Sequence, residues 1–276
     1  MRKPSAERFL FDASRRAWLA CAATWPAWMA ASERPAGDRA PTRVPILVYH
    51  RFAPAVLDSM TVRTARFEDH LRTIKKLGCK VVPLADWVAY RRGERGPLPE
   101  RAVVLTADDG HRSQFDVMMP LLQREGWPVT LFIYPSAISN ASYAMSWEQL
   151  RQWRADPNMS VQSHTYWHPN LVRDRQTMPP DAFERHALHQ LTRSRQVLNQ
   201  RLDAAVSLLA WPFGLSDPGL QQWAQDSGYQ AAFALENRSA SRHDPLYAVP
   251  RHLMVDSVDA AQLAVRLEAA FAQEDA

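Results

Sequence analysis

The segment AVVLTADDG, residues 102–110, combines a continuous apolar run with two adjacent carboxylates at its end. An apolar run of this length, bounded by charged and proline residues, is typical of a strand that is buried on both faces. Asp108 and Asp109 are poor core residues, because an ionised pair loses its hydration on burial and the two charges repel each other. The pair therefore requires a strong positive partner, and a divalent metal ion is the simplest one.

A second segment, SHTYWHP at residues 163–169, offers two imidazoles four residues apart, His164 and His168. One aspartate and two histidines make three protein ligands and leave a coordination position for water, as in catalytic rather than structural zinc sites. The other aspartate of the pair is then free to act as a base toward that water. Taken alone, each segment has a plainer interpretation, a solvated Asp-Gly turn or two half-buried histidines.

Strand-like and helix-like segments alternate from residue 44 onward. Apolar, strand-like runs occupy residues 45–49, 80–83, 102–107, 129–134, 159–163, 206–210, 229–235 and 247–253. Helical periodicity lies between them, for example in residues 113–125, in the segment capped by Ser146, and in a terminal helix capped by Ser257. Such alternation favours a parallel sheet, either open and doubly wound or closed into a barrel, with polar residues meeting at the carboxyl ends of the strands.

Together with AWPFG at residues 210–214, the two polar segments resemble the successive motifs of the polysaccharide deacetylases, the NodB-type carbohydrate esterases. The resemblance implies an α/β fold, a distorted (β/α) barrel of about seven strands, in one domain at residues 44–276. It also implies a metal-dependent hydrolase that removes N-acetyl groups from a glycan of the N-acetylglucosamine type and releases acetate. The form of the third motif is similar to that of the exported poly-N-acetylglucosamine deacetylase branch.

The family pattern makes the first aspartate the catalytic base and the second a metal ligand. This resemblance therefore implies Asp108 as the base and Asp109, His164 and His168 as the ligands of one divalent ion. Zn²⁺ is the expected ion, with Co²⁺ or Ni²⁺ as alternatives. The general acid is harder to identify, because the late Leu-x-His motif of many relatives has no clean copy; His252 is the nearest candidate.

Four further residues are expected in the substrate site. The branch carries an arginine where Arg251 stands, and charge pairing with it would hold Asp108 ionised. The turn that contains Trp211 and Phe213 would supply a wall and a backbone N–H for the oxyanion, and His50 follows the first strand of the barrel. The plainer interpretations are a surface salt bridge for the arginine, a simple strand-to-helix turn, and a structural hydrogen bond for the histidine.

Three alternative functions stay open. An O-acetyl esterase on a xylan-like glycan, or a deacylase acting on peptidoglycan or a lipid-linked sugar, would use the same metal and base. A non-catalytic glycan-binding relative is a different class, and the complete Asp, Asp, His, His set argues against it. In each case the expected partner is an acetylated glycan, and the chain is expected to be a monomer.

The first 31 residues are expected to be a targeting segment, because basic residues precede an apolar stretch that ends in small residues. SRRAWL at residues 14–19 resembles a twin-arginine export signal, which implies a periplasmic or extracellular protein; an ordinary secretory signal or an anchor helix is the alternative. Membrane association would then require that this segment is retained. Residues 32–43 resemble a linker. Residues 1–31 hold five Lys/Arg and two Asp/Glu, so they account for +3 of the formal net charge of +4, and no nucleic-acid partner is expected.

Overall fold

The computed structural model describes residues 43–272. The expected export signal at residues 1–31 lies outside these residues, and so does the expected linker except for Arg43, which begins strand β1 (Arg43–Val44). Within the described range, no helix combines the length and the hydrophobicity that a membrane span requires.

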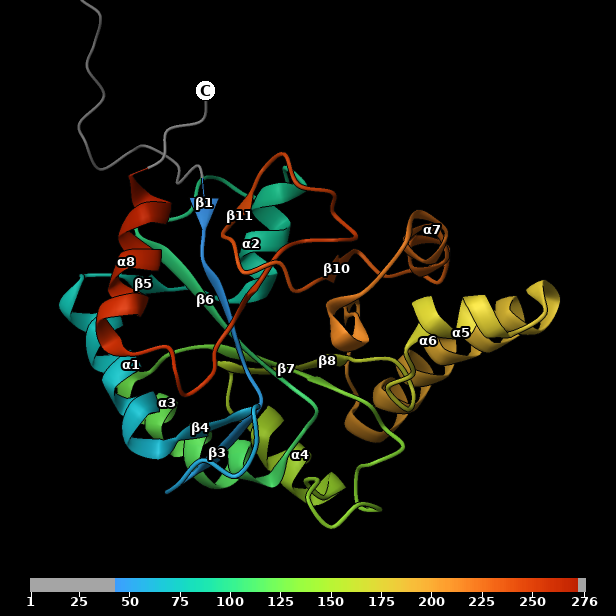
Figure 1. Ribbon diagram of the computed structural model, residues 1–276, viewed down its shortest axis with the longest axis horizontal. Helices are drawn as coiled ribbons and strands as arrows, with labels where there is room; N and C mark the ends of the chain where they lie inside the picture. Colours follow the sequence, from blue (N-terminus) through green and yellow to red (C-terminus); the bar gives the residue numbers. More distant parts are fainter. Residues whose placement is uncertain (1–42, 273–276) are drawn as a thin grey trace, which may run out of the picture. The chain divides into compact units, whose positions relative to one another are not determined.

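Seven parallel strands form the central sheet, in the order β10-β9-β8-β7-β6-β2-β12 (Figure 1). Their bounds are β2 (Ile46–Tyr49), β6 (Ala102–Asp108), β7 (Val129–Ile133), β8 (Met159–Ser163), β9 (Leu208–Ala210), β10 (Ala231–Phe233) and β12 (His252–Leu253). A short strand β5 (Lys80–Val81) pairs with the start of β6. The sheet curls, and β10 and β12 are the two ends of the strand order. The predicted distorted barrel of about seven strands is confirmed.

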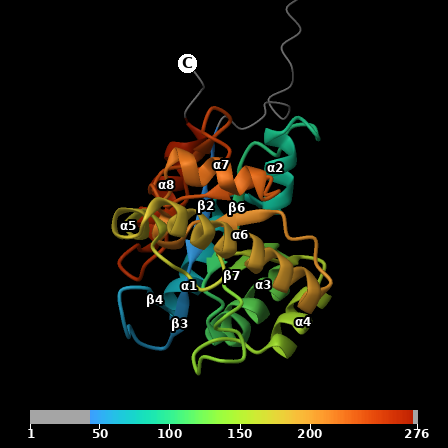
Figure 2. The same cartoon turned by 90° about the vertical axis from the view of Figure 1, so that its right-hand side faces the viewer.

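Helices cover the outside of the curled sheet (Figure 2). They are α1 (Thr64–Lys76), α2 (Leu84–Arg91), α3 (Met119–Glu125), α4 (Trp147–Ala155), α5 (Leu171–Thr177), α6 (Pro180–Leu202), α7 (Pro218–Asp226) and α8 (Ala260–Phe271), with two shorter helical turns, η2 (Gln114–Met118) and η3 (Pro212–Gly214). Ser146 caps α4 as predicted, and a capping box with Gln149 fixes this end.

Four sequence-based expectations differ from the structure. Residues 113–125 are not one α-helix, because η2 is a π-helical turn that precedes α3. Helix α8 is capped by Asp259 rather than Ser257. The run at residues 247–253 is not one continuous strand: it contains β12 and, before it, an isolated bridge of Val249 to Phe233 of β10. Helix α5, capped by Asn170, was not predicted, because its seven residues are too few to show an apolar period.

The alternation of side chains along β6 separates two cores. Val103, Leu105 and Ala107 belong to the larger cluster, which lies between the sheet and the outer helices. Val104 belongs to the smaller cluster, in which side chains from several strands meet inside the barrel. Asp108 has the parity of Val104, since successive side chains of a strand point to opposite faces. The carboxylate is therefore delivered to the interior at the carboxyl end of the barrel.

Two pairs of short strands lie beside the main sheet. β1 pairs antiparallel with β11 (Ala240–Ser241), and β3 (Arg51–Ala53) pairs in parallel with β4 (Thr61–Arg63). The segment between β3 and β4 is tied by Asp58, whose carboxylate accepts a hydrogen bond from the backbone N–H of Met60. This arrangement brings Arg51 and Met60 to the same end of the barrel as Asp108.

Candidate active site

Asp108 is the last residue of β6 and is 1% exposed. Arg251, which is fully buried, donates two hydrogen bonds to it, Nη1 to Oδ1 at 2.8 Å and Nη2 to Oδ2 at 2.7 Å. Burial alone would raise the pKa of this carboxyl, but the Arg251 charge, with smaller effects of His164 and His50, lowers the pKa to about 2. Asp108 is therefore held as a carboxylate in a place with almost no water.

The guanidinium of Arg251 has further support. Its Nε donates to the carbonyl of Ala234 at 3.3 Å, and its plane lies over the ring of Phe132 with 5.3 Å between the central carbon and the ring centroid. A buried charge needs such partners, because its lost hydration must be replaced. Arg251 thus both pairs with the carboxylate of Asp108 and fixes its orientation.

Asp109, His164 and His168 converge directly beside Asp108 and form what we call the triad. One ligand-type atom from each lies within 4.8 Å of the other two. The Oδ1 atom of Asp109 lies 3.6 Å from Nε2 of His164 and 3.7 Å from Nε2 of His168. These separations are too long for hydrogen bonds but suit three ligands around one ion. Oδ1 of Asp109 is also buried without a hydrogen-bond partner among the described residues, so this donor set fits a divalent metal ion.

The tautomer of His164 follows from its second nitrogen. Nδ1 lies 2.8 Å from the carbonyl oxygen of Ala210, so it carries the proton and donates it. Nε2 is then left as a lone pair directed at the triad, which is the state that a metal requires. Backbone conformation helps as well: Asp109 and His168 have φ values of 76° and 64°. Non-glycine residues in this region are uncommon and cluster at functional sites.

A cavity of about 390 Å³ opens over these groups. Asp108 and the three triad residues line it, together with His50, Arg51, Met60, Trp211, Phe213, Gly214, Leu235 and Leu253. The lining combines a cluster of ionisable side chains with apolar and aromatic residues, a composition that suits a small polar ligand carrying an apolar group. Leu253 and the turn after β9 both contribute to its wall.

His50 lies in this cavity and is 8% exposed. Its Nδ1 atom is buried without a hydrogen-bond partner in the described part of the chain. Burial, with smaller effects of the His164 and Arg251 charges, lowers the pKa of the imidazole below its ordinary value, although the charges of Asp108 and Asp109 oppose this shift. Its backbone is fixed by Gln114, whose Nε2 donates to the carbonyl oxygens of both His50, at 2.7 Å, and Asp108.

The structure does not bring His252 to the cavity. Arg251 contacts Asp108 and Leu253 lines the cavity, so the residue between them points to the opposite face of its strand. Nε2 of His252 shares a hydrogen bond with the hydroxyl of Ser239 at 3.0 Å. Burial lowers the pKa of His252 to about 4, with a further contribution from the charge of Arg266. The expectation that His252 is the general acid therefore has no geometric support.

The turn after β9 has the predicted position beside the triad. Trp211 is fully buried and donates its indole N–H to the carbonyl of Tyr247 at 2.9 Å. Phe213 is 54% exposed, has φ 59°, and packs edge-on against His168 with centroids 4.8 Å apart. Gly214 has φ 70°, and a Cβ there would lie 2.4 Å from Cβ of Leu235, so only glycine fits without movement.

Sequence reasoning missed several residues of this site. Gln114 and Tyr134 do not line the cavity but contact residues that do. Gln114 donates to the carbonyl of His50, and the Tyr134 ring lies beside those of His164 and His168, with centroids 6.4 and 5.3 Å away. Gln114 starts the π-helical turn, and such turns are frequent at functional sites. This feature is visible only in the structure, so no sequence pattern marked Gln114.

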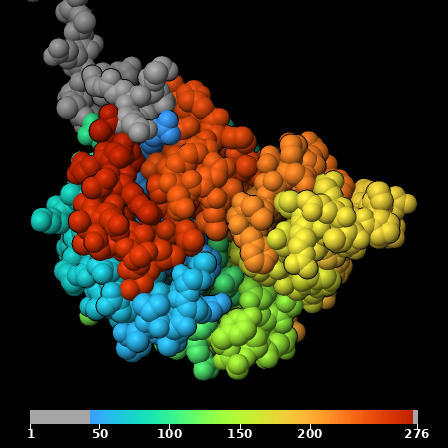
Figure 3. All heavy atoms as spheres, in the orientation of Figure 1, coloured from blue at the N-terminus to red at the C-terminus, as the bar shows by residue number. Residues whose placement is uncertain are grey.

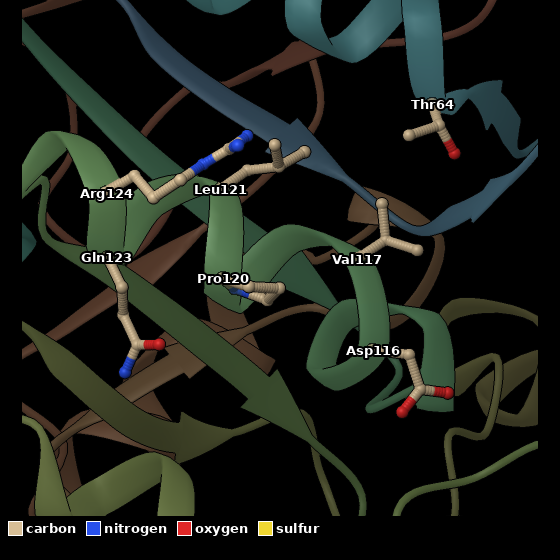
Figure 4. A pocket seen from close by; sticks show the side chains of 7 residues that line it. All are labelled: Thr64, Asp116, Val117, Pro120, Leu121, Gln123 and Arg124. Atoms are coloured by element: carbon tan, nitrogen blue, oxygen red, sulfur yellow. The ribbon is translucent and has the colours of Figure 1, made fainter.

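A larger open groove of about 680 Å³ lies elsewhere, between the start of α1 and the η2–α3 segment (Figure 4). Its lining residues are Thr64, Asp116, Val117, Pro120, Leu121, Gln123 and Arg124. None of them belongs to the cavity over the triad, and they form no ligand cluster. We therefore assign the chemistry to the smaller cavity.

Comparison with known proteins gives a consistent result. The polysaccharide deacetylase family model matches residues 95–232, half of the chain. A poly-β-1,6-N-acetyl-D-glucosamine N-deacetylase of Staphylococcus aureus (strain MRSA252) is 21% identical over 213 residues, 76% of this chain and 73% of that protein.

Two solved structures share the fold. The deacetylase PplD of Streptococcus pyogenes in complex with acetate has a TM-score of 0.72 and 20% identity, over 82% of this chain and 99% of that one. IcaB from Ammonifex degensii has a TM-score of 0.71 and 21% identity, over 82% and 97% of the two chains.

Proposed function

The chain belongs to the polysaccharide deacetylase family, and from this premise we propose that it uses one divalent metal ion to hydrolyse N-acetyl groups of a glycan of the N-acetylglucosamine type. One observation carries the proposal. Three ligand-type side chains converge in a single cavity, beside a fourth carboxylate that a buried arginine keeps ionised.

Asp109, His164 and His168 would hold the ion. Two imidazoles and one carboxylate favour Zn²⁺, with Co²⁺ and Ni²⁺ as the alternatives. When bound, such an ion supplies a Lewis acid for a carbonyl oxygen and lowers the pKa of water to about 7.

Asp108 is the proposed general base. Arg251 occupies one lone pair on each carboxylate oxygen, and each oxygen retains a second one that can accept a proton from the attacking water. Oδ2 of Asp108 lies 3.9 Å from Nε2 of His164, so the base is directly beside the triad without being part of it. This separation of roles requires two carboxylates in one cavity, and the adjacent residues Asp108 and Asp109 supply them at the end of β6.

His50 is the proposed proton donor to the departing amine. It is the one histidine of the cavity lining that does not belong to the triad. Burial lowers the pKa of this imidazole despite the opposing charges of Asp108 and Asp109, which makes its protonated form a stronger acid toward the departing amine. This assignment replaces His252 and extends the role that the sequence suggested for His50, which was substrate binding.

The turn after β9 is proposed to receive the acyl group. The N–H groups of Trp211, Gly214 and Leu215 donate to backbone carbonyls at 2.9, 2.9 and 3.2 Å. Phe213 therefore offers the N–H of this turn that an oxyanion contact would use. The apolar side chains of Phe213, Leu235 and Leu253 would surround the acetyl methyl group and exclude water.

The substrate assignment draws on the relative from Staphylococcus aureus, whose name states a poly-β-1,6-N-acetyl-D-glucosamine N-deacetylase. We propose an acetylated polymer of this type as the substrate of the present chain. An export signal at residues 1–31 would place the enzyme in the periplasm or outside the cell, where such a polymer is encountered.

Acetate release from a panel of glycans tests the proposal. The panel contains β-1,6- and β-1,4-linked N-acetylglucosamine oligomers and acetylated xylan, each assayed before chelation, after chelation, and after return of Zn²⁺, Co²⁺ or Ni²⁺. We expect acetate from the N-acetylated oligomers, its loss with the chelator, and its return with metal. Release from acetylated xylan alone would make the enzyme an O-acetyl esterase, and no release from any glycan would favour a non-catalytic binding protein.

A further inference from the structure

An aromatic surface lies next to the cavity, on the side that faces α5 and α6. It consists of Tyr166, Trp167, His186 and His189, and we call it the Trp167 platform. Trp167 is 47% exposed and immediately precedes His168, whose side chain lines the cavity. Phe213, also exposed, lines the cavity and packs edge-on against the ring of His168. Two exposed aromatic residues are therefore connected to His168, one through the chain and one through a ring contact.

The Trp167 ring is supported rather than loose. Its centroid lies 5.4 Å from that of His186 and 5.9 Å from that of His189, both on α6. His186 is itself held by Asp174 of α5, with 3.3 Å between Nε2 and Oδ2. Tyr166 packs edge-on against His189, with centroids 5.6 Å apart. A large ring that is already immobilised loses little side-chain entropy when a ligand stacks on it.

The backbone of the segment is fixed as well. The N–H groups of Tyr166 and Trp167 both donate to Oε1 of Gln190, at 3.2 and 3.0 Å, and Gln190 is completely buried. The two aromatic residues lie between Thr165 and His168, whose φ values are 63° and 64°. A β-branched residue in this region is a strained outlier. With this backbone conformation, His168 lines the cavity and Trp167 does not.

The segments that carry the platform adjoin the one that carries Phe213. Helix α6 contacts both α5 and α7, and α7 follows the Phe213 turn. In Figure 3 the yellow segment of α5 and the start of α6 lies beside the orange segment around η3 and α7. The segment that carries the platform and the one that carries Phe213 are therefore neighbours, as a polymer that reaches both would require.

We infer that the Trp167 platform is an accessory sugar-binding subsite, which holds a glycan unit outside the cavity and makes the enzyme prefer polymeric over short substrates. This inference rests on the proposed function, since it requires an N-acetylated glycan in the cavity. Sugar rings present C–H faces that stack on aromatic rings, and the imidazole and phenol groups around Trp167 can hydrogen-bond their hydroxyl groups. No charged ligand is required, because His186 is already paired with Asp174.

Kinetics on N-acetylglucosamine oligomers of two and six units test the inference, with the variants Trp167→Ala, His189→Ala and Trp167→Tyr. We expect Trp167→Ala to raise KM for the hexamer about five- to tenfold with kcat retained, and to change KM for the dimer less than about twofold. His189→Ala should show a smaller shift in the same direction, and Trp167→Tyr should restore most of the loss. Val265→Ala, at a 70% exposed position on α8, is the matched control for removing an exposed apolar side chain.

A second measurement separates this inference from the function on which it rests. Calorimetric binding of the hexamer to Asp108→Asn needs no turnover, and adding Trp167→Ala should weaken it by the same factor. Equal effects on dimer and hexamer, or none on either, would overturn the platform even if acetate is released normally. Because Trp167 adjoins His168, metal content is measured in each variant; should Trp167→Ala lose metal, the length dependence of His189→Ala decides.

Discussion

Arg251 donates hydrogen bonds from Nη1 and Nη2 to the two oxygens of the Asp108 carboxylate, at 2.8 and 2.7 Å, although the two residues are 143 positions apart in the chain. Both side chains are almost completely buried. A paired charge in such a place is tolerated, but removing one partner leaves the other uncompensated. The pair therefore links the stability of the barrel to the ionisation of the proposed base.

Arg251→Lys and Arg251→Met should separate these two effects. Lysine keeps the charge but cannot form the bidentate contact, so we expect kcat to fall while the fold is largely retained. Methionine leaves Asp108 buried and unpaired, which should lower the free energy of unfolding by about 3–5 kcal/mol. Urea unfolding and steady-state kinetics on the same preparations measure both quantities. If Arg251→Met unfolded with the same free energy as wild type, the pair would not contribute to stability.

Asp108→Asn and Asp109→Asn should differ in their metal content. Asp108→Asn removes the base but none of the three ligands, so metal should remain while kcat falls about 10²–10⁴-fold. Asp109→Asn removes a ligand, so both metal and activity should be lost. Elemental analysis of the purified proteins gives the metal content. If Asp108→Asn turned over at the wild-type rate with its metal in place, Asp108 would have to be removed from the mechanism.

His50→Ala and His252→Ala distinguish the two candidates for the proton donor. His50 lines the cavity, so its loss should lower kcat about 10²–10⁴-fold without loss of the triad. His252 bonds to Ser239 on the other face of its strand, and its loss should cost about 1 kcal/mol of stability while kcat is retained. The opposite pattern would return the general acid to His252. Metal content is the control for both variants.

The sequence was sufficient to predict the position of residues that stand at, or directly after, the carboxyl end of a strand. Asp108 ends strand β6, Asp109 directly follows it, and His164 directly follows β8; the carboxyl ends of parallel strands meet at one end of a barrel. Knowing the strand and its last residue was therefore enough to expect these side chains close together. His168 followed from His164, since a short loop joins them.

The sequence was insufficient where the position depends on contacts between distant segments. A strand of two residues carries no alternation of its own, and the contact of Arg251 with Asp108 is between distant segments, so the sequence could not show that His252 points away from the cavity. The partner that fixes the tautomer of His164 is a backbone carbonyl, that of Ala210, which no side-chain pattern reveals. Gln114 is a similar case, because it bonds only to carbonyl groups of two other strand ends.

Gly214→Ala tests the turn that forms the cavity wall. Gly214 has φ 70° and a new Cβ would meet both Cβ and the backbone N of Leu235, at 2.4 and 2.6 Å. Gly126→Ala is a matched control, since Gly126 has φ 67° and nothing lies within 4 Å of its added Cβ. The control should cost about 1–2 kcal/mol for the left-handed conformation alone. Gly214→Ala should cost clearly more and should also lower activity, as urea unfolding and kinetics can show; equal costs would mean that the turn adapts freely.

His70 should make the fold sensitive to mild acid. This buried imidazole donates from Nε2 to the carbonyl of Val258 at 2.7 Å, and its Nδ1 accepts from the hydroxyl of Tyr49 at 3.2 Å, so both nitrogens are used in the neutral state. Burial lowers the pKa of His70 below its ordinary value of 6.5, against a smaller opposing effect of the Val258 hydrogen bond.

Because the folded pKa is the lower one, the unfolded chain takes up a proton at a pH where the folded protein does not. The free energy of unfolding should therefore fall as the pH drops below 6.5, by at most about 1.4 kcal/mol per pH unit from this group, until the folded pKa is reached. Urea unfolding of wild type and His70→Gln as a function of pH isolates the effect. The variant should lose this part of the slope but run parallel to wild type above about pH 7.5, where His70 is neutral in both states. Identical slopes in the acid range would show that another group controls the acid sensitivity.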